Sequence, residues 1–233
     1  MRERIRTHKQ LLLLAALLSA LVTQPLVASD SVASKLAYDL LISAISVALL
    51  FVVFEERWQR WTALVLMAPA ALLTLGFYFA PGVPSRVIAV PYHASIVLFL
   101  GFAVGAIVRD VFRRPTIGFD DVLGAFCGYL LLGVVWGNLY VLVEVLAPGS
   151  FAVSPAIRWQ LDDLHLRRAL FNYLSFAILS SLGYNDLTTV APVANTLTWL
   201  EVLAAQFYLA VVIAQIIGMK LARVVGADGP EAK

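Results

Sequence analysis

Apolar residues in this chain occur in runs about as long as the hydrocarbon core of a bilayer is thick. A helix needs roughly 20 mostly apolar residues to cross that core. Runs of this kind occupy residues 11–27, 36–54, 61–80, 87–108, 122–146 and 196–225. The pattern predicts an all-α membrane protein with six transmembrane helices.

The composition also indicates lipid rather than water as the surroundings of the chain. Of its 233 residues, 61% are hydrophobic and 14% are charged, whereas about 25% charged residues are typical of soluble domains. The formal net charge of +2 is too small to indicate a nucleic-acid partner. Cys127 is the only cysteine, which excludes an intrachain disulfide and a cysteine-based metal cluster, and we expect it to be buried.

The distribution of lysine and arginine predicts the orientation in the membrane. If the N-terminus is cytoplasmic, most of the 17 lysine and arginine residues fall on the cytoplasmic side, as the positive-inside rule requires. We therefore expect a multi-pass protein of the plasma membrane with both termini in the cytoplasm. A basic start, a short apolar stretch and the small residues Ala28 and Ser29 also describe a signal peptide. We expect a retained helix; cleavage within residues 1–29 would leave five spans in the same orientation.

A shorter apolar stretch lies between the fifth and sixth runs. Residues 168–179 are too few to cross the hydrocarbon core, and small and turn-forming residues follow them as far as Asp186. Since both flanking runs are long enough to span, this stretch has to enter and leave the membrane at the same face. Non-helical backbone at membrane depth is tolerated only where it is buried in protein or lines water. The stretch therefore predicts a re-entrant helix followed by a loop that lines a pore.

The turn of this loop contains a motif. Its residues are Ser180, Ser181, Leu182, Gly183, Tyr184, Asn185 and Asp186. With this motif between two membrane helices, the segment 120–225 resembles the two-helix pore domain of potassium channels. The filter of that family typically reads Thr-Val-Gly-Tyr-Gly-Asp, and many bacterial members have Thr-Thr-Leu-Gly-Tyr-Gly-Asp. The resemblance implies a homotetramer that conducts K+ passively, because a ring of carbonyl oxygens around one ion needs four copies of the loop.

The resemblance assigns roles by position. Carbonyl oxygens and one hydroxyl would bind the ion, from Ser181, Leu182, Gly183 and Tyr184. Filter support would come from Ser180, Asn185, Asp186 and Tyr173. Gly183 can adopt the positive φ that turns its carbonyl inward, and the helix over residues 168–179 would direct the partial negative charge of its carbonyl end toward the ion. No cofactor is implied other than permeant K+ or another monovalent cation.

The sequence departs from the pattern of the family in two respects. Asn185 replaces the second filter glycine, and Tyr173 and Leu174 replace the paired tryptophans that are frequent in the pore helix. Asparagine is the non-glycine residue that best tolerates the left-handed region, so the backbone can survive the first change. Three hypotheses follow: a K+ channel, a poorly selective Na+/K+ channel, and a non-conducting membrane scaffold or sensor with a degenerate pore loop.

Polar residues in the sixth run are candidates for cavity lining or gating. Glu201, Gln206 and Gln215 can each face water or bond to a neighbouring helix. Glu201 lies in the first turns of this run, where it can face an outer vestibule or brace the filter strand, and Glu144 at the end of the fifth run competes for either role. Gly218 can act as a gating hinge, but a lone glycine in a membrane helix is commonly a packing site, and we favour packing.

Other polar residues have both functional and structural interpretations. Asp162, Asp163 and His165 are close in sequence, but no second cluster completes a metal site, so we expect an exposed outer loop. His93 can be a pH-sensitive group or a buried, satisfied histidine, and we favour burial; the same alternatives apply to Asp39. Catalytic groups are not gathered at one depth, so we do not expect an enzyme.

The first four runs do not have the pattern of a voltage-gated channel. Between Arg86 and Arg109 the fourth run contains no lysine or arginine, whereas a voltage sensor needs regularly spaced arginines. We therefore expect residues 1–115 to form a four-helix membrane domain without a classical voltage sensor. Residues 116–225 would form the pore domain, and residues 226–233 a short cytoplasmic tail.

Overall fold

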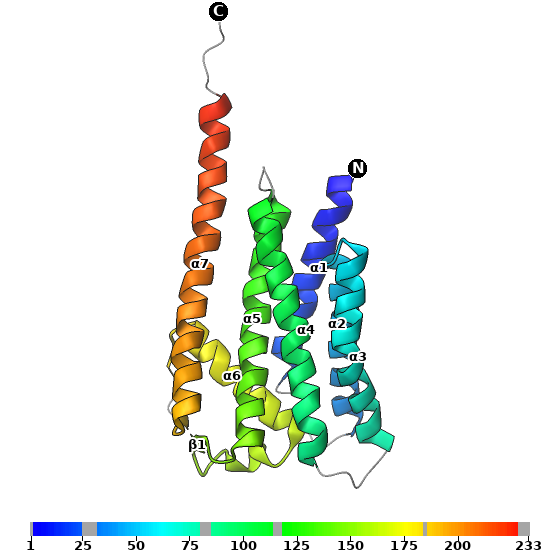
Figure 1. The fold of residues 1–233 in the computed structure, drawn as a ribbon, viewed down its shortest axis with the longest axis vertical. Helices are drawn as coiled ribbons and strands as arrows, with labels where there is room; N and C mark the ends of the chain where they lie inside the picture. Colours follow the sequence, from blue (N-terminus) through cyan, green and yellow to red (C-terminus); the bar gives the residue numbers. More distant parts are fainter. Residues whose placement is uncertain (1, 25–31, 80–84, 114–117, 184–185, 228–233) are drawn as a thin grey trace, which may run out of the picture.

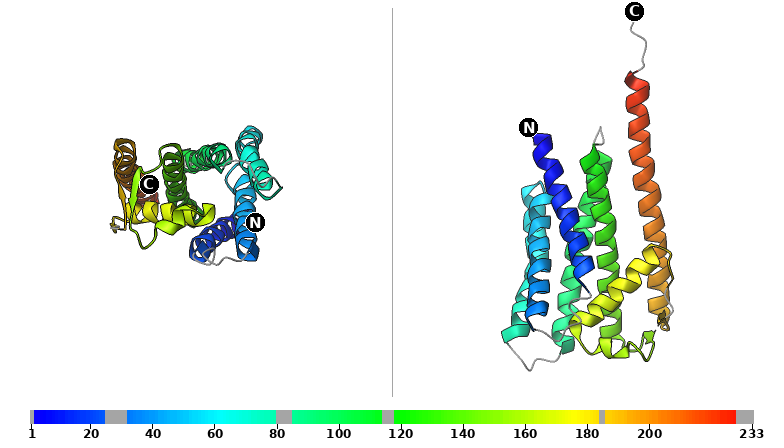
Figure 2. Two further views of the ribbon diagram at one scale, coloured as in Figure 1. Left: turned by 90° about the horizontal axis from the view of Figure 1, so that it is seen from below. Right: turned by 180° about the vertical axis from the view of Figure 1, so that it is seen from behind.

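The computed structural model describes residues 2–24, 32–79, 85–113, 118–183 and 186–227 (Figure 1). Its long helices run up and down beside one another: α1 (Arg2–Thr23), α2 (Val32–Val52), α3 (Arg57–Phe79), α4 (Ser85–Arg113), α5 (Phe119–Leu146) and α7 (Pro192–Ala227). A shorter helix, α6 (Leu164–Leu179), crosses one side of α5 obliquely and ends beside α7, as the further views in Figure 2 show. A 3₁₀ helix, η2 (Arg158–Leu161), precedes it.

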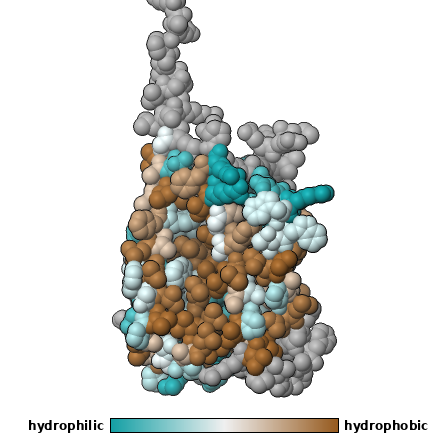
Figure 3. Space-filling model, in the orientation of Figure 1, coloured by the Kyte–Doolittle hydropathy of each residue, from teal (hydrophilic) through white to brown (hydrophobic). Residues whose placement is uncertain are grey.

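Each long helix overlaps one of the six apolar runs, and four of the helices are long and apolar enough to cross a membrane. Within the described residues these segments are Ser34–Val52, Val87–Arg113, Phe119–Leu146 and Pro192–Gln215. The apolar part of α1, Gln10–Thr23, is shorter. Hydrophobic side chains cover the middle of the face in Figure 3, and hydrophilic ones lie toward its upper and lower ends. These features fit a mostly helical membrane protein; spans beyond the four stay a prediction.

One hydrophobic core joins the first four helices to α5. It contains buried side chains such as Leu49 on α2, Phe99 on α4 and Leu131 on α5. Cys127 on α5 belongs to this core and is fully buried, which confirms the expectation for this residue. α5 therefore packs against the N-terminal helices on one side and faces α6 and α7 on the other (Figure 2).

A second core lies where α5, α6 and the start of α7 meet. The rings of Tyr140 and Phe151 contact edge to face with centroids 5.5 Å apart, and those of Phe151 and Phe171 do so at 4.8 Å. Phe151 belongs to β1 (Phe151–Val153), which pairs antiparallel with β2 (Leu187–Thr189). The strand before α6 and the strand that follows the loop are thus joined to each other and to this core.

Glu144 holds the turn between α5 and β1. Its carboxylate accepts hydrogen bonds from the backbone N–H groups of Gly149 (2.8 Å) and Phe151 (3.3 Å), and the side chain is buried. Glu144 therefore does not face an open vestibule within this chain. It supports β1 directly, and β2 only through the pairing of the two strands.

The short helix begins earlier than predicted. α6 starts at Leu164 rather than at residue 168, because the Asp163 carboxylate caps it by accepting hydrogen bonds from the backbone N–H groups of His165 (2.8 Å) and Leu166 (3.1 Å). The expectation of an exposed outer loop is therefore wrong for Asp163 and His165, which are partly buried at the start of a helix.

Candidate functional site

α6 crosses α5 at two glycines. A Cβ on Gly137 would lie 2.9 Å from the Cα of Asn172 and 2.1 Å from its side-chain oxygen. A Cβ on Gly133 would lie 2.7 Å from the ring of Phe176. Glycine at both positions lets the two backbones approach closely, and the Ser175 hydroxyl lies 2.8 Å from the Gly133 carbonyl oxygen as a result.

α6 ends in a Schellman motif that reverses the chain. The backbone N–H of Leu182 donates to the Ala177 carbonyl (2.8 Å), and that of Ser181 donates to the Ile178 carbonyl (3.0 Å). Ser181 takes the left-handed position with φ 56°, which is costly for a residue other than glycine. The Ser180 hydroxyl closes the last turn by donating to a carbonyl one turn earlier (2.7 Å). The chain then returns to the end of the bundle where β2 and α7 begin (Figures 1 and 2).

The residues after α6 are those that the sequence assigned to the filter. Ser181, Leu182 and Gly183 are exposed in the single chain, and Leu182 is 72% exposed. Gly183 has φ 74°, a conformation that favours glycine. No described atom lies within 4 Å of the position that a Cβ on Gly183 would take. Tyr184 and Asn185 lie outside the residues that the structure describes.

Hydrogen bonds hold both ends of this loop. The Tyr129 hydroxyl on α5 donates to the carbonyl of Leu179, the last residue of α6 (2.9 Å). On the other side, the backbone N–H of Ser154 donates to the carbonyl of Asp186 (2.8 Å), next to the β1–β2 pair. Tyr173, the other predicted support residue, is half-exposed on α6. The loop is therefore anchored to α5 at its start and to β1 at its end.

A buried carboxyl group joins α7 to the back of α6. Glu201 is fully buried, and its two carboxyl oxygens are hydrogen-bonded to the Tyr140 hydroxyl on α5 and the Ser175 hydroxyl on α6. Ser175 has one hydroxyl proton but lies within hydrogen-bond distance of two oxygens, those of Glu201 and of the Gly133 carbonyl. Within this chain Glu201 links three helices and does not face solvent.

The other polar candidates on α7 lie away from this contact. Gln206 is exposed, Gln215 is partly buried, and Gly218 has no described atom within 4 Å of its Cβ position. α7 packs against the chain on one side, through residues such as Ala205 and Val212. Large apolar side chains are exposed elsewhere on the helix: Trp199, Leu203, Phe207, Ile213 and Ile217. The gating or lining roles of Gln206, Gln215 and Gly218 stay predictions.

An ion-pair network fixes the start of α6 to α2 and α4. Asp39 on α2 lies 3.6 Å from Nη2 of Arg168 and 3.1 Å from Nε2 of His165. Nη1 of Arg168 donates to the Tyr92 hydroxyl on α4 (2.9 Å). The Arg168 guanidinium group also lies over the Tyr38 ring, 5.1 Å from its centroid. The predicted alternatives for Asp39 thus resolve to a paired, partly buried carboxylate.

Lys35 adds a second link between α2 and the start of α6. Its Nζ lies 2.6 Å from a carboxylate oxygen of Asp163. Burial alone would raise the pKa of Asp163, but Lys35 and the backbone N–H groups of Leu166 and His165 outweigh burial and hold the pKa below its usual value of 3.8. The stability from this group is present above the unfolded-state pKa and is lost as the pH falls through the lowered folded-state pKa.

Sequence reasoning missed Arg168, Tyr140 and Ser175 as members of the site. One signal was available, because a carboxylate such as Asp39 in an apolar run needs a partner. The identity of that partner depends on how α2 and α6 pack, and no sequence spacing reveals it. His93 is fully buried and its Nδ1 is bonded to Asn138 (2.8 Å), which confirms the expected burial; its Nε2 has no hydrogen-bond partner among the described residues, so the expectation of a satisfied histidine holds only in part.

Comparisons of the chain with protein-family models, with curated proteins and with solved structures found no match. The functional interpretation therefore depends on the loop after α6, on the groups that hold it and on the resemblance of its sequence motif.

Proposed function

We propose that the chain is one subunit of a homotetrameric, potassium-channel-like cation channel of the plasma membrane. In this proposal the six long helices span the bilayer with both termini in the cytoplasm. α6 and residues 180–186 form a re-entrant pore helix and filter loop. The observation that carries the proposal is the exposed loop at the carbonyl end of α6, where Ser181 and Gly183 have φ values of 56° and 74°.

The end of α6 provides a favourable environment for a cation. The last carbonyl groups of α6 accept hydrogen bonds from Leu182, Ser181 and Tyr129, and the aligned peptide dipoles of the helix place partial negative charge at this end. These groups lie next to the loop whose backbone would replace the hydration water of an ion. The hydrogen bond from Tyr129 to the Leu179 carbonyl fixes this helix end against α5.

One chain supplies only part of a coordination shell. Leu182 is 72% exposed, and no described atom lies within 4 Å of the Cβ position of Gly183. Closed four-fold symmetry would cover these residues with three further copies and complete rings of carbonyl oxygens. The exposed apolar side chains of α7 would then face neighbouring subunits or lipid.

The groups behind α6 support a fixed filter. Gly133 and Gly137 let α6 approach α5, and Glu201 joins α6 to α7 through Ser175. A filter that replaces hydration water needs carbonyl groups held in place before the ion arrives, and packed helices on both sides of α6 provide this.

The selectivity of the pore depends on Asn185. This residue replaces the second glycine of the potassium-channel motif. A backbone that adopts the left-handed conformation at this position would select K+, whereas a filter of less regular geometry would pass Na+ and K+ alike. Both outcomes belong to the same proposed cation pore.

Cation flux through the purified chain in liposomes tests the proposal. Wild type is expected to pass K+ down its gradient, and Gly183→Ala to lose most of the flux, because alanine is strained at φ 74° by roughly 1–2 kcal/mol. Gly101→Ala is the matched control, since Gly101 lies in α4, outside the proposed pore segment, and an added Cβ there meets nothing within 4 Å. This control is expected to retain wild-type flux.

The same preparation separates the alternatives. Reversal potentials in mixed KCl and NaCl would report the selectivity, and equal permeability would replace the K+-selective channel with a poorly selective one. A folded tetramer that passes no monovalent cation at any voltage or pH would contradict the channel and favour a membrane scaffold or sensor.

A further inference from the structure

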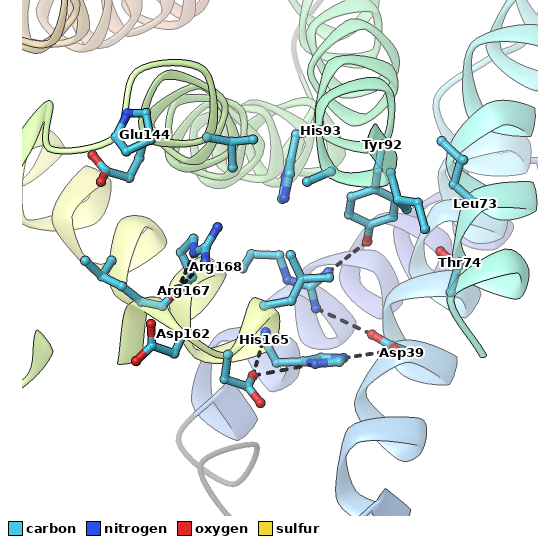
Figure 4. Close-up of a pocket in the computed structure, with 17 residues that line it drawn as sticks. Asp39, Leu73, Thr74, Tyr92, His93, Glu144, Asp162, His165, Arg167 and Arg168 are labelled. Carbon is cyan, nitrogen blue, oxygen red and sulfur yellow. Dashed lines mark hydrogen bonds and ion pairs between the residues drawn. The ribbon is translucent and has the colours of Figure 1, made fainter. Parts of the chain in front are cut away.

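A polar cavity lies at the opposite end of α6 from the loop. Its volume is about 470 Å³, and parts of α2, α3, α4, α5 and the start of α6 enclose it (Figure 4). This volume is within the range of small-molecule sites. The proposed filter contributes no residue to the described lining of the cavity.

His93 presents an unpartnered ring nitrogen in this cavity. The Asn138 side chain donates from its amide nitrogen to the Val134 carbonyl (2.7 Å), which turns its oxygen toward Nδ1 of His93, 2.8 Å away. Nδ1 therefore carries the proton of this hydrogen bond. Nε2 has no hydrogen-bond partner among the described residues, and the side chain is 0% exposed. Nε2 is thus a buried acceptor that a donor would satisfy.

Arg168 presents an unpartnered donor in the same cavity. The side chain is buried, and its Nη1 donates to Tyr92. Nη2 lies 3.6 Å from a carboxylate oxygen of Asp39, beyond hydrogen-bond distance, and has no hydrogen-bond partner among the described residues. In Figure 4, the Arg168 guanidinium group is joined by dashed lines to Tyr92 and Asp39, and His93 lies on the same cavity wall. The cavity lining therefore contains one acceptor and one donor that lack a hydrogen-bond partner within the described residues.

Three carboxylates around the cavity already have donors, and the fourth, Asp162, is exposed to solvent. Asp39 is paired with Arg168 and His165. Asp163 accepts hydrogen bonds from Lys35 and from the start of α6, and Glu144 accepts them from two backbone N–H groups. The buried side-chain groups of the lining that lack a hydrogen-bond partner among the described residues are therefore a guanidinium nitrogen and an imidazole nitrogen, which favours an anion over a cation as the ligand.

An apolar cavity adjoins the polar one. Its volume is about 250 Å³, and it lies between α1, α2, α3, α4 and α5. Thr74, Tyr92 and Arg168 line both cavities. Arg168 thus lies at the boundary between the polar and the apolar cavity. A residue that binds the charged group of an amphiphile is expected at such a boundary.

We infer that the polar cavity binds an oxyanion with a neighbouring hydroxyl group, of the glycerophosphate type. The anionic oxygen accepts a hydrogen bond from Nη2 of Arg168, and the hydroxyl donates to Nε2 of His93. A phosphatidylglycerol headgroup with its tail in the apolar cavity has this chemistry, and so does free glycerol phosphate. The inference does not rest on ion conduction.

Binding of short-chain lipids to the purified full chain in detergent tests the inference. Dioctanoyl phosphatidylglycerol carries the phosphate and the hydroxyl groups, whereas dioctanoyl phosphatidylethanol carries the same charge without a hydroxyl. Phosphatidylglycerol is expected to bind more tightly. Arg168→Gln should weaken its binding at least about tenfold, as expected for a lost hydrogen bond to a charged group. His93→Leu should abolish its advantage over phosphatidylethanol.

Arg158→Gln is the matched control, because it removes the same charge at an exposed position outside the cavity. Should Arg168→Gln fail to fold, His93→Leu provides the comparison. Free glycerol 3-phosphate shows whether the ligand is a lipid or a soluble molecule. If it binds, and the same variants weaken its binding, the site is supported and its ligand is soluble. Equal affinity for the two lipids, or binding that survives in the cavity variants, would overturn the inference.

Discussion

At the scale of single residues, the contacts of Glu201 join α7 to α6, the proposed pore helix. Its carboxyl group joins Tyr140 on α5 and Ser175 on α6, and all three side chains are fully buried. The sequence indicated a polar residue in the sixth run but left its direction open. Helical spacing within α7 does not determine which neighbouring helix a side chain contacts. Both partners of Glu201 lie on other helices, so the sequence could not identify them.

Replacement of Glu201 should reveal this contact as a loss of stability. Glu201→Ala leaves the buried Tyr140 hydroxyl without its acceptor, which costs about 1–3 kcal/mol. Glu201→Gln keeps one acceptor oxygen, so its thermal unfolding temperature in detergent should fall less. Gln206→Ala, at an exposed position of the same helix, serves as the control. A Glu201→Ala variant that unfolds at the wild-type temperature would show that the contact is unimportant.

At the scale of elements, the lengths of the apolar runs predicted the long helices, and the start of α6 was missed. Apolar run length is a direct consequence of the bilayer thickness, so it marks spans well. The start of α6 depends on the cap at Asp163, whose carboxylate bonds to backbone N–H groups of the first turn and so allows polar residues to begin the helix. β1 and β2 were not predicted, because each has three residues and pairs with a strand far away in sequence.

The crossing of α5 and α6 gives a prediction at this scale. Gly137→Ala would place a Cβ 2.9 Å from the Asn172 Cα, so α6 has to move away from α5. We expect a destabilisation of about 1–3 kcal/mol and a reduced K+ flux through the reconstituted chain. Gly105→Ala on α4 is the control, since an added Cβ there meets nothing within 4 Å. Equal unfolding temperatures and fluxes for both variants would argue against a close crossing.

At the scale of the whole molecule, α5 belongs to both hydrophobic cores. It packs with the first four helices through residues such as Leu131 and with the α6 region through residues such as Tyr140. The ion pairs of Asp39 with Arg168 and His165 add a link from α2 to α6. The N-terminal helices are therefore structurally coupled to the proposed pore segment. The sequence did not predict this coupling, because it arises from side chains that meet only after folding.

The arrangement of several chains decides whether this segment is a filter, and a density map of the purified full chain in K+ is the most direct test. The proposed channel predicts a tetramer with a four-fold axis and density for dehydrated ions along it, between Ser181 and Tyr184. A lone subunit, or an assembly that leaves the Gly183 segment in bulk solvent away from any symmetry axis, would contradict the proposal.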